Sequence, residues 1–233
     1  MKYKNIIEGN FINRPNRFIA EVMIGGKVEL AHVKNTGRCK EILTPQTTVY
    51  LEDFEGRMGM RKMRYSLIAV KKGEMMINMD SQAPNKVVQE GLQTETIKLN
   101  GMKTLKKIRP ETVYGNSRFD FYICDEDGQE GYIEVKGVTL EENGIAAFPD
   151  APTERGVKHI KELIAAASAG YKAYIIFVVQ MKGMKYFVPN DRTDPAFGKT
   201  LREAAQNGVE VMALQCDVTP DSIEVSDSLK IKL

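Results

Sequence analysis

The stretch from Ser117 to Gly137 predicts a β-hairpin that carries charges inside an apolar pattern. Apolar and polar residues alternate on both sides of an Asp-Glu-Asp-Gly-Gln-Glu-Gly segment, which is typical of two strands joined by a turn. Arg118 and Asp120 share one face of the first strand, and Glu134 and Lys136 share one face of the second.

The length of the turn decides whether these charges meet. A two-residue turn at Asp127-Gly128 would send Asp120 and Glu134 to opposite faces of the hairpin. A three-residue loop ending with Gly128 at positive φ would place Asp120 across from Glu134 instead. Facing carboxylates repel each other unless a cation such as Mg²⁺ lies between their oxygens. The second register therefore predicts a divalent-metal site bordered by Lys136.

Length and composition indicate a folded protein of two domains. The chain has 233 residues, of which 42% are hydrophobic, and this is sufficient for two cores. No apolar run approaches the roughly 18 residues of a membrane span, and the start of the chain lacks the apolar core of a signal peptide. We therefore expect a cytoplasmic protein with no membrane partner.

Cysteine and histidine usage excludes several kinds of site. The three cysteines, Cys39, Cys124 and Cys216, lie far apart and form no Cys-x-x-Cys pair, so neither a disulfide framework nor a zinc site is indicated. Only two histidines are present, His32 and His159, which excludes a metal site built from several histidines.

Charge is distributed unevenly along the chain. Residues 1–80 hold 14 Lys and Arg against 9 Asp and Glu, whereas residues 81–233 hold 19 against 22. A basic module joined to a module with an acidic cluster suits a protein that binds a polyanion beside a cation. Ordinary solvated surface would also accommodate a net charge of about +5 in the first module.

Residues 1–80 are predicted to form a small β-barrel. Five short strands with glycine-containing breaks favour a barrel of the oligonucleotide-binding (OB) type, although an SH3-like barrel fits the same spacing. A turn at Gly25-Gly26 joins the first two strands. The expected strands are Phe18–Ile24, Lys27–Val33, Thr47–Leu51, Ser66–Val70 and Met75–Met79.

Two basic segments of this first domain are candidates for phosphate contact. The loop at residues 34–40 offers cations, a hydroxyl and a glycine that lets backbone N–H groups approach an anion. A second segment, at residues 57–64, alternates cations with methionines, whose thioethers we expect to pack inward. Solvated loops are the alternative for both. The predicted DNA-binding residues of the first segment are Lys34, Asn35, Thr36 and Arg38.

Residues 81–233 are predicted to form an α/β domain around the hairpin. A first helix at Lys86–Leu92 carries Glu90, and Lys103–Arg109 forms a basic linker or strand entry that Pro110 ends. Strands at Val138–Leu140 and Ile145–Phe148 extend the hairpin into a three-stranded meander. The elements expected after it are a helix at Thr153–Ala169, a strand buried on both faces at Tyr174–Val179, a strand at Tyr186–Val188, a helix at Asp194–Asn207 and a strand at Val209–Leu214.

The order of helix, meander, helix and buried strand resembles the core of the PD-(D/E)xK nucleases. Asp120 corresponds to the first acid of that motif, and Glu134-Val135-Lys136 corresponds to its E-x-K. Phe119 stands where the motif has proline. The expected fold class is therefore α/β (α+β), with an N-terminal OB-like barrel followed by a PD-(D/E)xK nuclease-like mixed-sheet domain.

Longer segments of the chain resemble the sugar fermentation stimulation protein A (SfsA) family. The resemblance covers nearly the whole chain and implies a DNA-binding protein of the bacterial or archaeal cytoplasm. The matching segments are NTGR at 35–38, SRFDF at 117–121, EVKGVTL at 134–140, FPDAPTERG at 148–156 and KHIKEL at 158–163.

These resemblances imply a catalytic centre that needs Mg²⁺ or Mn²⁺. Asp120 and Glu134 would hold the ion, with Glu90 as a further candidate ligand, while Lys136 orients a water or stabilises charge on the phosphate. The expected partner is double-stranded DNA. The alternative is that Asp120, Glu134 and Lys136 form an ion pair across the strands with a purely structural role. A second alternative is a non-catalytic, sequence-nonspecific DNA-binding regulator linked to sugar (maltose) metabolism.

Four further residues are candidates for holding the neighbouring phosphates. Arg118 shares the face of Asp120, and the other three lie near the start of the helix that Thr153 is expected to cap. These three are Arg155, Lys158 and His159.

Overall fold

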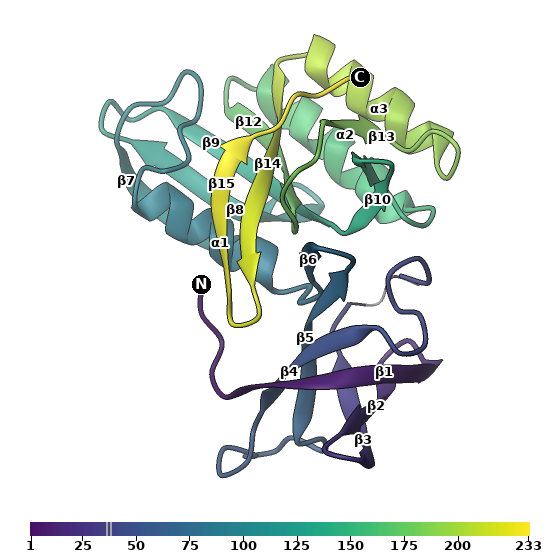
Figure 1. Cartoon of the computed structure of the whole chain (residues 1–233). Helices are drawn as coiled ribbons and strands as arrows, with labels where there is room; N and C mark the ends of the chain where they lie inside the picture. Colours follow the sequence, from purple (N-terminus) through teal and green to yellow (C-terminus); the bar gives the residue numbers. More distant parts are fainter. Residues whose placement is uncertain (36, 38) are drawn as a thin grey trace. The chain divides into compact units, whose positions relative to one another are not determined.

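The computed structural model describes residues 1–35, 37 and 39–233 and divides them into two compact units (Figure 1). The predicted domain boundary after residue 80 lies close to the first division of the chain, at Ala83. The first unit also takes in two short segments from later in the chain. The units are Met1–Ala83, Gln180–Lys182 and Cys216–Glu224 for the first, and Pro84–Val179, Gly183–Gln215 and Val225–Leu233 for the second.

The first unit is a closed β-barrel, as predicted. Its strands follow the order β3-β2-β1-β4-β5-β6, and a parallel pairing between β3 and β5 closes the barrel over five strands. At the turn between β2 and β3, Gly25 and Gly26 have φ of +55° and +80°, which confirms the predicted tight turn. The strands are β1 Ile6–Asn16, β2 Ile19–Ile24, β3 Lys27–Val33, β4 Thr48–Asp53, β5 Tyr65–Lys72 and β6 Met75–Asn78.

Strand β1 was not predicted from the sequence. It contains Gly9, Pro15 and three asparagines, residue types that are depleted in strands. It nevertheless pairs with β2 on one side and β4 on the other, and it places Phe11 in the core at 2% exposure. Pairing on both sides thus overrides the weak local preference of this segment.

The second unit contains most of a six-stranded mixed sheet with the order β15-β14-β12-β9-β8-β7, and only the segment Cys216–Glu224 of its β14–β15 hairpin is assigned to the first unit. Strand β12 lies in the middle, parallel to both β9 and β14, and Tyr174–Val179 are almost completely buried, which confirms the strand predicted to be covered on both faces. The strands are β7 Leu105–Tyr114, β8 Ser117–Asp125, β9 Glu130–Val138, β12 Lys172–Val179, β14 Val209–Thr219 and β15 Ser222–Ser228.

Three helices accompany this sheet: α1 at Ala83–Gln93, α2 at Glu154–Ser168 and α3 at Pro195–Gln206. Thr153 caps α2 as predicted, because its Oγ1 accepts a hydrogen bond from the Gly156 N–H at 3.0 Å. Helix α2 packs against β8, β9 and β12. Helix α2 therefore covers the strands that carry the predicted acids.

The predicted meander is wrong in its third strand. Strands β10 (Leu140–Glu142) and β11 (Ile145–Phe148) form a separate small sheet with β13 (Tyr186–Pro189), and β7 is the strand that pairs with β8. Pro110 lies within β7 and does not end it. A proline is tolerated there because β7 is the edge strand of the sheet, where one row of N–H groups has no partner strand.

Candidate metal centre

The β8–β9 hairpin adopts the register that brings the two acids together. Phe121 pairs with Ile133, and Gly128 has φ of +83° in the loop. The loop therefore has three residues, as in the second of the two hairpin registers considered from the sequence. Because the ladder ends at Phe121, the next position along each strand places Asp120 and Glu134 across from each other.

Glu134 is buried, with 2% of its surface exposed, and its two carboxylate oxygens have different surroundings. Oε1 accepts hydrogen bonds from Lys136 Nζ at 2.5 Å and from His159 Nδ1 at 2.5 Å. Oε2 is also buried and has no hydrogen-bond partner within the described part of the chain. A buried carboxylate oxygen in this condition is costly unless another group binds it.

Asp120 is half-buried and is held by two donors. Its Oδ1 accepts a hydrogen bond from Asn85 Nδ2 at 2.7 Å, and its Oδ2 accepts one from the Val135 N–H at 2.7 Å. Asn85 lies in the first turn of α1. The carboxylate is thereby fixed between a helix and the neighbouring strand.

The pKa values of the two acids shift in opposite directions. Burial raises the pKa of Asp120 above its ordinary value, and the nearby charge of Glu134 adds to the rise. Burial also acts to raise the pKa of Glu134, but the hydrogen bond from His159 and the charge of Lys136 outweigh it, so this pKa lies below its ordinary value. Opposed shifts in neighbouring acids are typical of functional sites.

The donor set fits a small hard cation. Mg²⁺ binds through one or two carboxylates and keeps several waters, so Asp120 and Glu134 can supply its protein ligands. The unsatisfied Oε2 of Glu134 is the oxygen that such an ion would engage. Across residues 1–35, 37 and 39–233, no cluster of three or more His, Cys, Asp or Glu could hold a metal. Water or a substrate phosphate would therefore complete the coordination.

The structure brings together three of the predicted residues and adds two that sequence reasoning did not place there. Asp120, Glu134 and Lys136 converge as predicted, whereas Asn85 lies just before the helix predicted at Lys86–Leu92 and was given no role. His159 was predicted to contact DNA but is buried against Glu134. His159 lies three residues after Gly156 and four before Leu163, and this helical spacing could have suggested the inward direction.

Glu90 lies on α1 but is exposed. Successive helix residues are about 100° apart, so Glu90 lies about 140° around the helix from Asn85, the residue that contacts Asp120. The metal role of Glu90 stays a prediction, and the orientation of α1 does not favour it.

The residues predicted to contact phosphates from β8 and from α2 already have protein partners. Arg118 Nε lies 2.8 Å from the carboxylate of Glu111, and because both side chains are more than half exposed this ion pair is weak. Lys158 Nζ donates to the Asn116 carbonyl at 2.8 Å, and Arg155 Nε donates to His159 Nε2 at 3.4 Å. Arg118 and Lys158 are exposed and could exchange these partners for phosphate.

The predicted DNA-binding loop of the first unit is only partly described. Lys34 Nζ is paired with Asp80 Oδ2 at 2.6 Å, and Asp80 is fully buried, so the charge of Lys34 is already compensated. The Asn35 Oδ1 accepts a hydrogen bond from the backbone N–H two residues later. Thr36 and Arg38 lie outside the described residues, so their predicted contacts remain predictions.

One methionine of the second basic segment does not pack inward as expected, whereas Met58 and Met63 are partly buried. Met60 is completely exposed, which contradicts the prediction that the thioethers pack inward. The loop is held by its arginines instead: the Arg61 guanidinium lies 3.7 Å from the centre of the Phe54 ring, and Arg64 bonds to both carboxylate oxygens of Asp53. Since these contacts fix the loop, the thioether of Met60 need not be buried.

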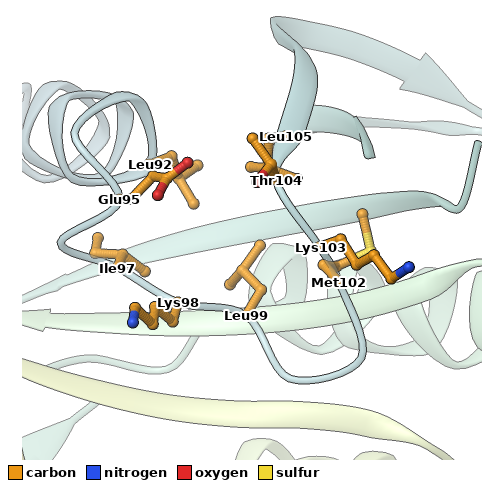
Figure 2. Close-up of a pocket in the computed structure, with 9 residues that line it drawn as sticks. All are labelled: Leu92, Glu95, Ile97, Lys98, Leu99, Met102, Lys103, Thr104 and Leu105. Carbon is orange, nitrogen blue, oxygen red and sulfur yellow. The ribbon is translucent and has the colours of Figure 1, made fainter. Parts of the chain in front are cut away.

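A separate pocket of about 210 Å³ lies between the end of α1 and the start of β7 (Figure 2). Its walls combine aliphatic side chains such as Leu92, Ile97 and Leu99 with the stems of Lys98 and Lys103. No residue proposed for metal or DNA binding lines it. The pocket is small for a ligand site and lies apart from the chemistry of the acids.

Comparison with known proteins decides the family. A family model described as "Sugar fermentation stimulation protein RE domain" matches residues 82–222, and a second, "SfsA N-terminal OB domain", matches residues 12–79. The chain belongs to the SfsA family. The second match also assigns the barrel to the OB type and leaves the SH3-like alternative without support.

Relatives within this family match over the full length of the chain. A sugar fermentation stimulation protein homolog of Desulfitobacterium hafniense is 55% identical and covers 100% of this chain and 99% of its own. The homolog of Clostridium beijerinckii is 53% identical, with both chains fully covered. A solved structure, that of Pyrococcus furiosus SfsA in complex with Ca²⁺, is 30% identical with a TM-score of 0.88, covering 100% of this chain and 98% of that one.

Among the described residues, no helix has both the length and the apolar character needed to cross a membrane.

Proposed function

We propose that this chain binds DNA and hydrolyses its phosphodiester bonds with a divalent cation, Mg²⁺ or Mn²⁺, held by Asp120 and Glu134. The observation that carries the proposal is the convergence of these two acids beside Lys136, with Glu134 Oε2 buried and unsatisfied. The Pyrococcus furiosus relative was solved with Ca²⁺, another hard cation that prefers oxygen ligands. That finding supports a cation site in this fold.

The side chains around the site have distinct tasks in this proposal. A bound divalent ion would polarise the phosphodiester and lower the pKa of a coordinated water. Lys136 supplies a compact positive charge, 2.5 Å from Glu134 Oε1, that can stabilise the charge growing on the phosphate. Asn85 and the Val135 N–H hold Asp120 in place. Only 16% of the Lys136 side chain is exposed, so its charge is poorly screened by water.

DNA binding is supported by the OB family match and by charge. OB domains bind oligonucleotides through sequence-tolerant contacts, and residues 1–80 carry the basic excess of the chain. Arg38, Arg118 and Lys158 are the residues we propose for phosphate contact, with double-stranded DNA as the substrate. Lys34 is a weaker candidate because Asp80 compensates its charge.

The catalytic proposal is tested by comparing supercoiled plasmid cleavage by wild type and Asp120→Asn in Mg²⁺ and in Mn²⁺. We expect the variant to cleave at least about 100-fold more slowly, because it loses an anionic ligand of the ion. Asp127→Asn is the matched control, since Asp127 is exposed in the loop of the same hairpin. Equal cleavage by wild type and Asp120→Asn would remove Asp120 from the mechanism.

A second candidate function is non-catalytic, sequence-nonspecific DNA binding by a regulator of sugar (maltose) metabolism. The observation that favours it is the modest donor set, since the described part of the chain gives the ion two carboxylates and no third His, Cys, Asp or Glu. This candidate predicts DNA affinity in EDTA that falls steeply with salt, together with intact plasmid in Mg²⁺ and Mn²⁺. Metal-dependent cleavage would exclude it.

A further inference from the structure

His159 occupies a position that phosphate binding does not explain. It lies in the second turn of α2, is 6% exposed, and its ring packs against the ring of Phe119 in a T-shaped arrangement. Its Nδ1 lies 2.5 Å from Glu134 Oε1. A side chain buried in this way cannot reach DNA, but it can determine how Glu134 is held.

The neighbours of the ring determine which nitrogen carries the proton. Arg155, one turn earlier on α2, directs its Nε–H at His159 Nε2 over 3.4 Å. A guanidinium can only donate, so Nε2 must accept and has no hydrogen in this arrangement. The hydrogen of the neutral ring is then on Nδ1, from which it is donated to Glu134 Oε1.

This arrangement makes the two oxygens of Glu134 inequivalent. Lys136 and His159 both donate to Oε1, one from the same strand and one from α2, and together they fix the carboxylate from two sides. Oε2 is left as the one oxygen of this group without a donor among the described residues. In metal sites, partners that hydrogen-bond a ligand fix its orientation in the same manner.

We propose that His159 is a positioning residue: its Nδ1–H, oriented by Arg155, holds Glu134 Oε1 and so reserves Oε2 for a divalent cation. The cation part of this inference rests on the proposed function, whereas the tautomer does not. The lost contact in His159→Ala would let the carboxylate rotate, and cation affinity would fall although no ligand has been removed.

The tautomer is tested by imidazole ¹⁵N NMR on the intact protein at alkaline pH without metal. The chain has two histidines, so the His32→Gln variant assigns the signals. We expect His159 to be protonated on Nδ1. Protonation on Nε2 would overturn the inference whether or not the protein binds metal or DNA.

The positioning role is tested by calorimetric titration with Ca²⁺. We expect His159→Ala to bind Ca²⁺ at least about 10-fold more weakly than wild type, the range found for partners that orient metal ligands. His159→Asn should recover most of the affinity, because the asparagine amide nitrogen lies near the position of Nδ1. Lys161→Ala is the matched control, since Lys161 is exposed on the same helix.

Thermal unfolding of each variant separates positioning from stability. A merely structural role would lower the melting temperature of His159→Ala and leave its Ca²⁺ affinity at the wild-type level. That result would overturn the positioning role of His159 but would leave the proposed function standing. A wild-type protein that binds no Ca²⁺ would contradict the proposed function, and with it the role assigned to Oε2.

Discussion

Asp120 and Glu134 face one another, but their ionisation has opposite effects on the stability of the fold. Because the folded pKa of Glu134 is lowered, its ionised form stabilises the fold above the unfolded pKa, and this contribution is lost as the pH falls through the folded pKa. Because the folded pKa of Asp120 is raised, its ionisation costs stability once the pH exceeds the unfolded pKa. Without a cation, the ionised side chain of Asp120 therefore lowers the stability of the fold at neutral pH.

Replacing Asp120 by Asn should consequently stabilise the metal-free protein. The neutral amide removes repulsion with Glu134 and desolvation of a charge, so we expect the melting temperature in EDTA to rise by a few degrees. In Mg²⁺ or Ca²⁺ the order should reverse, because only the wild type gains stability from ligand binding. A variant that melts below wild type by the same margin in both conditions would contradict this account.

The hairpin loop is the element on which the site depends. Gly128 has φ of +83°, and a Cβ at this position would meet no atom within 4 Å, so the backbone angle alone restricts the residue. We expect Gly128→Val to lower the free energy of unfolding by about 1–2 kcal/mol and Gly128→Asn to cost less, because asparagine tolerates positive φ. Urea denaturation measures both. Equal stability of Gly128→Val and wild type would show that the loop does not need this conformation.

The local sequence pattern predicted the strands and the helix that carry the site, but it did not predict every strand that pairs with them. The alternation of β8, the cap at Thr153 and the apolar run of β12 each have a clear physical signal, and all were confirmed. Strand β9 was also confirmed, but its residues from Gly131 to Val135 are all buried, so its two faces do not alternate between core and solvent. The register was left open because the number of residues in a loop is not visible in the alternation itself. The second half of strand β7 was missed because Pro110 normally ends a strand, and only the edge position of β7 in the sheet makes this proline acceptable.

Of the site, the three charged residues were predictable and their supports were not. Asp120, Glu134 and Lys136 stand out in the sequence because they interrupt a buried pattern. Asn85 and His159 come from helices far away in the chain, and their contacts arise only from tertiary packing. A single buried histidine has no sequence signal that separates positioning from DNA contact.

At the scale of the whole chain, the first unit is held together in part by Gln180, a residue about 100 positions after the last strand of the barrel. Gln180 Nε2 donates to the backbone oxygen of Asn78 at 3.0 Å, to its Oδ1 at 3.0 Å and to the Asp80 carbonyl at 3.2 Å. Asn78 in turn donates to Tyr3 Oη at 3.0 Å. These groups are buried, so the network leaves little tolerance for a missing partner.

We expect Gln180→Ala to destabilise the protein by about 2–3 kcal/mol, because buried acceptors around Asn78 lose their donor. Chemical denaturation measures the loss, and the exposed Gln206→Ala serves as its control. If Gln180→Ala unfolds at the wild-type denaturant concentration, the network contributes nothing to stability.

The central claim is that Asp120 and Glu134 together hold a divalent ion, and calorimetric titration of wild type and Glu134→Gln with Mg²⁺ and Ca²⁺ tests it most directly. The account predicts one ion per wild-type chain, loss of binding in Glu134→Gln, and unchanged binding in Glu130→Gln, a matched change on the same strand. Wild-type affinity in Glu134→Gln would contradict it.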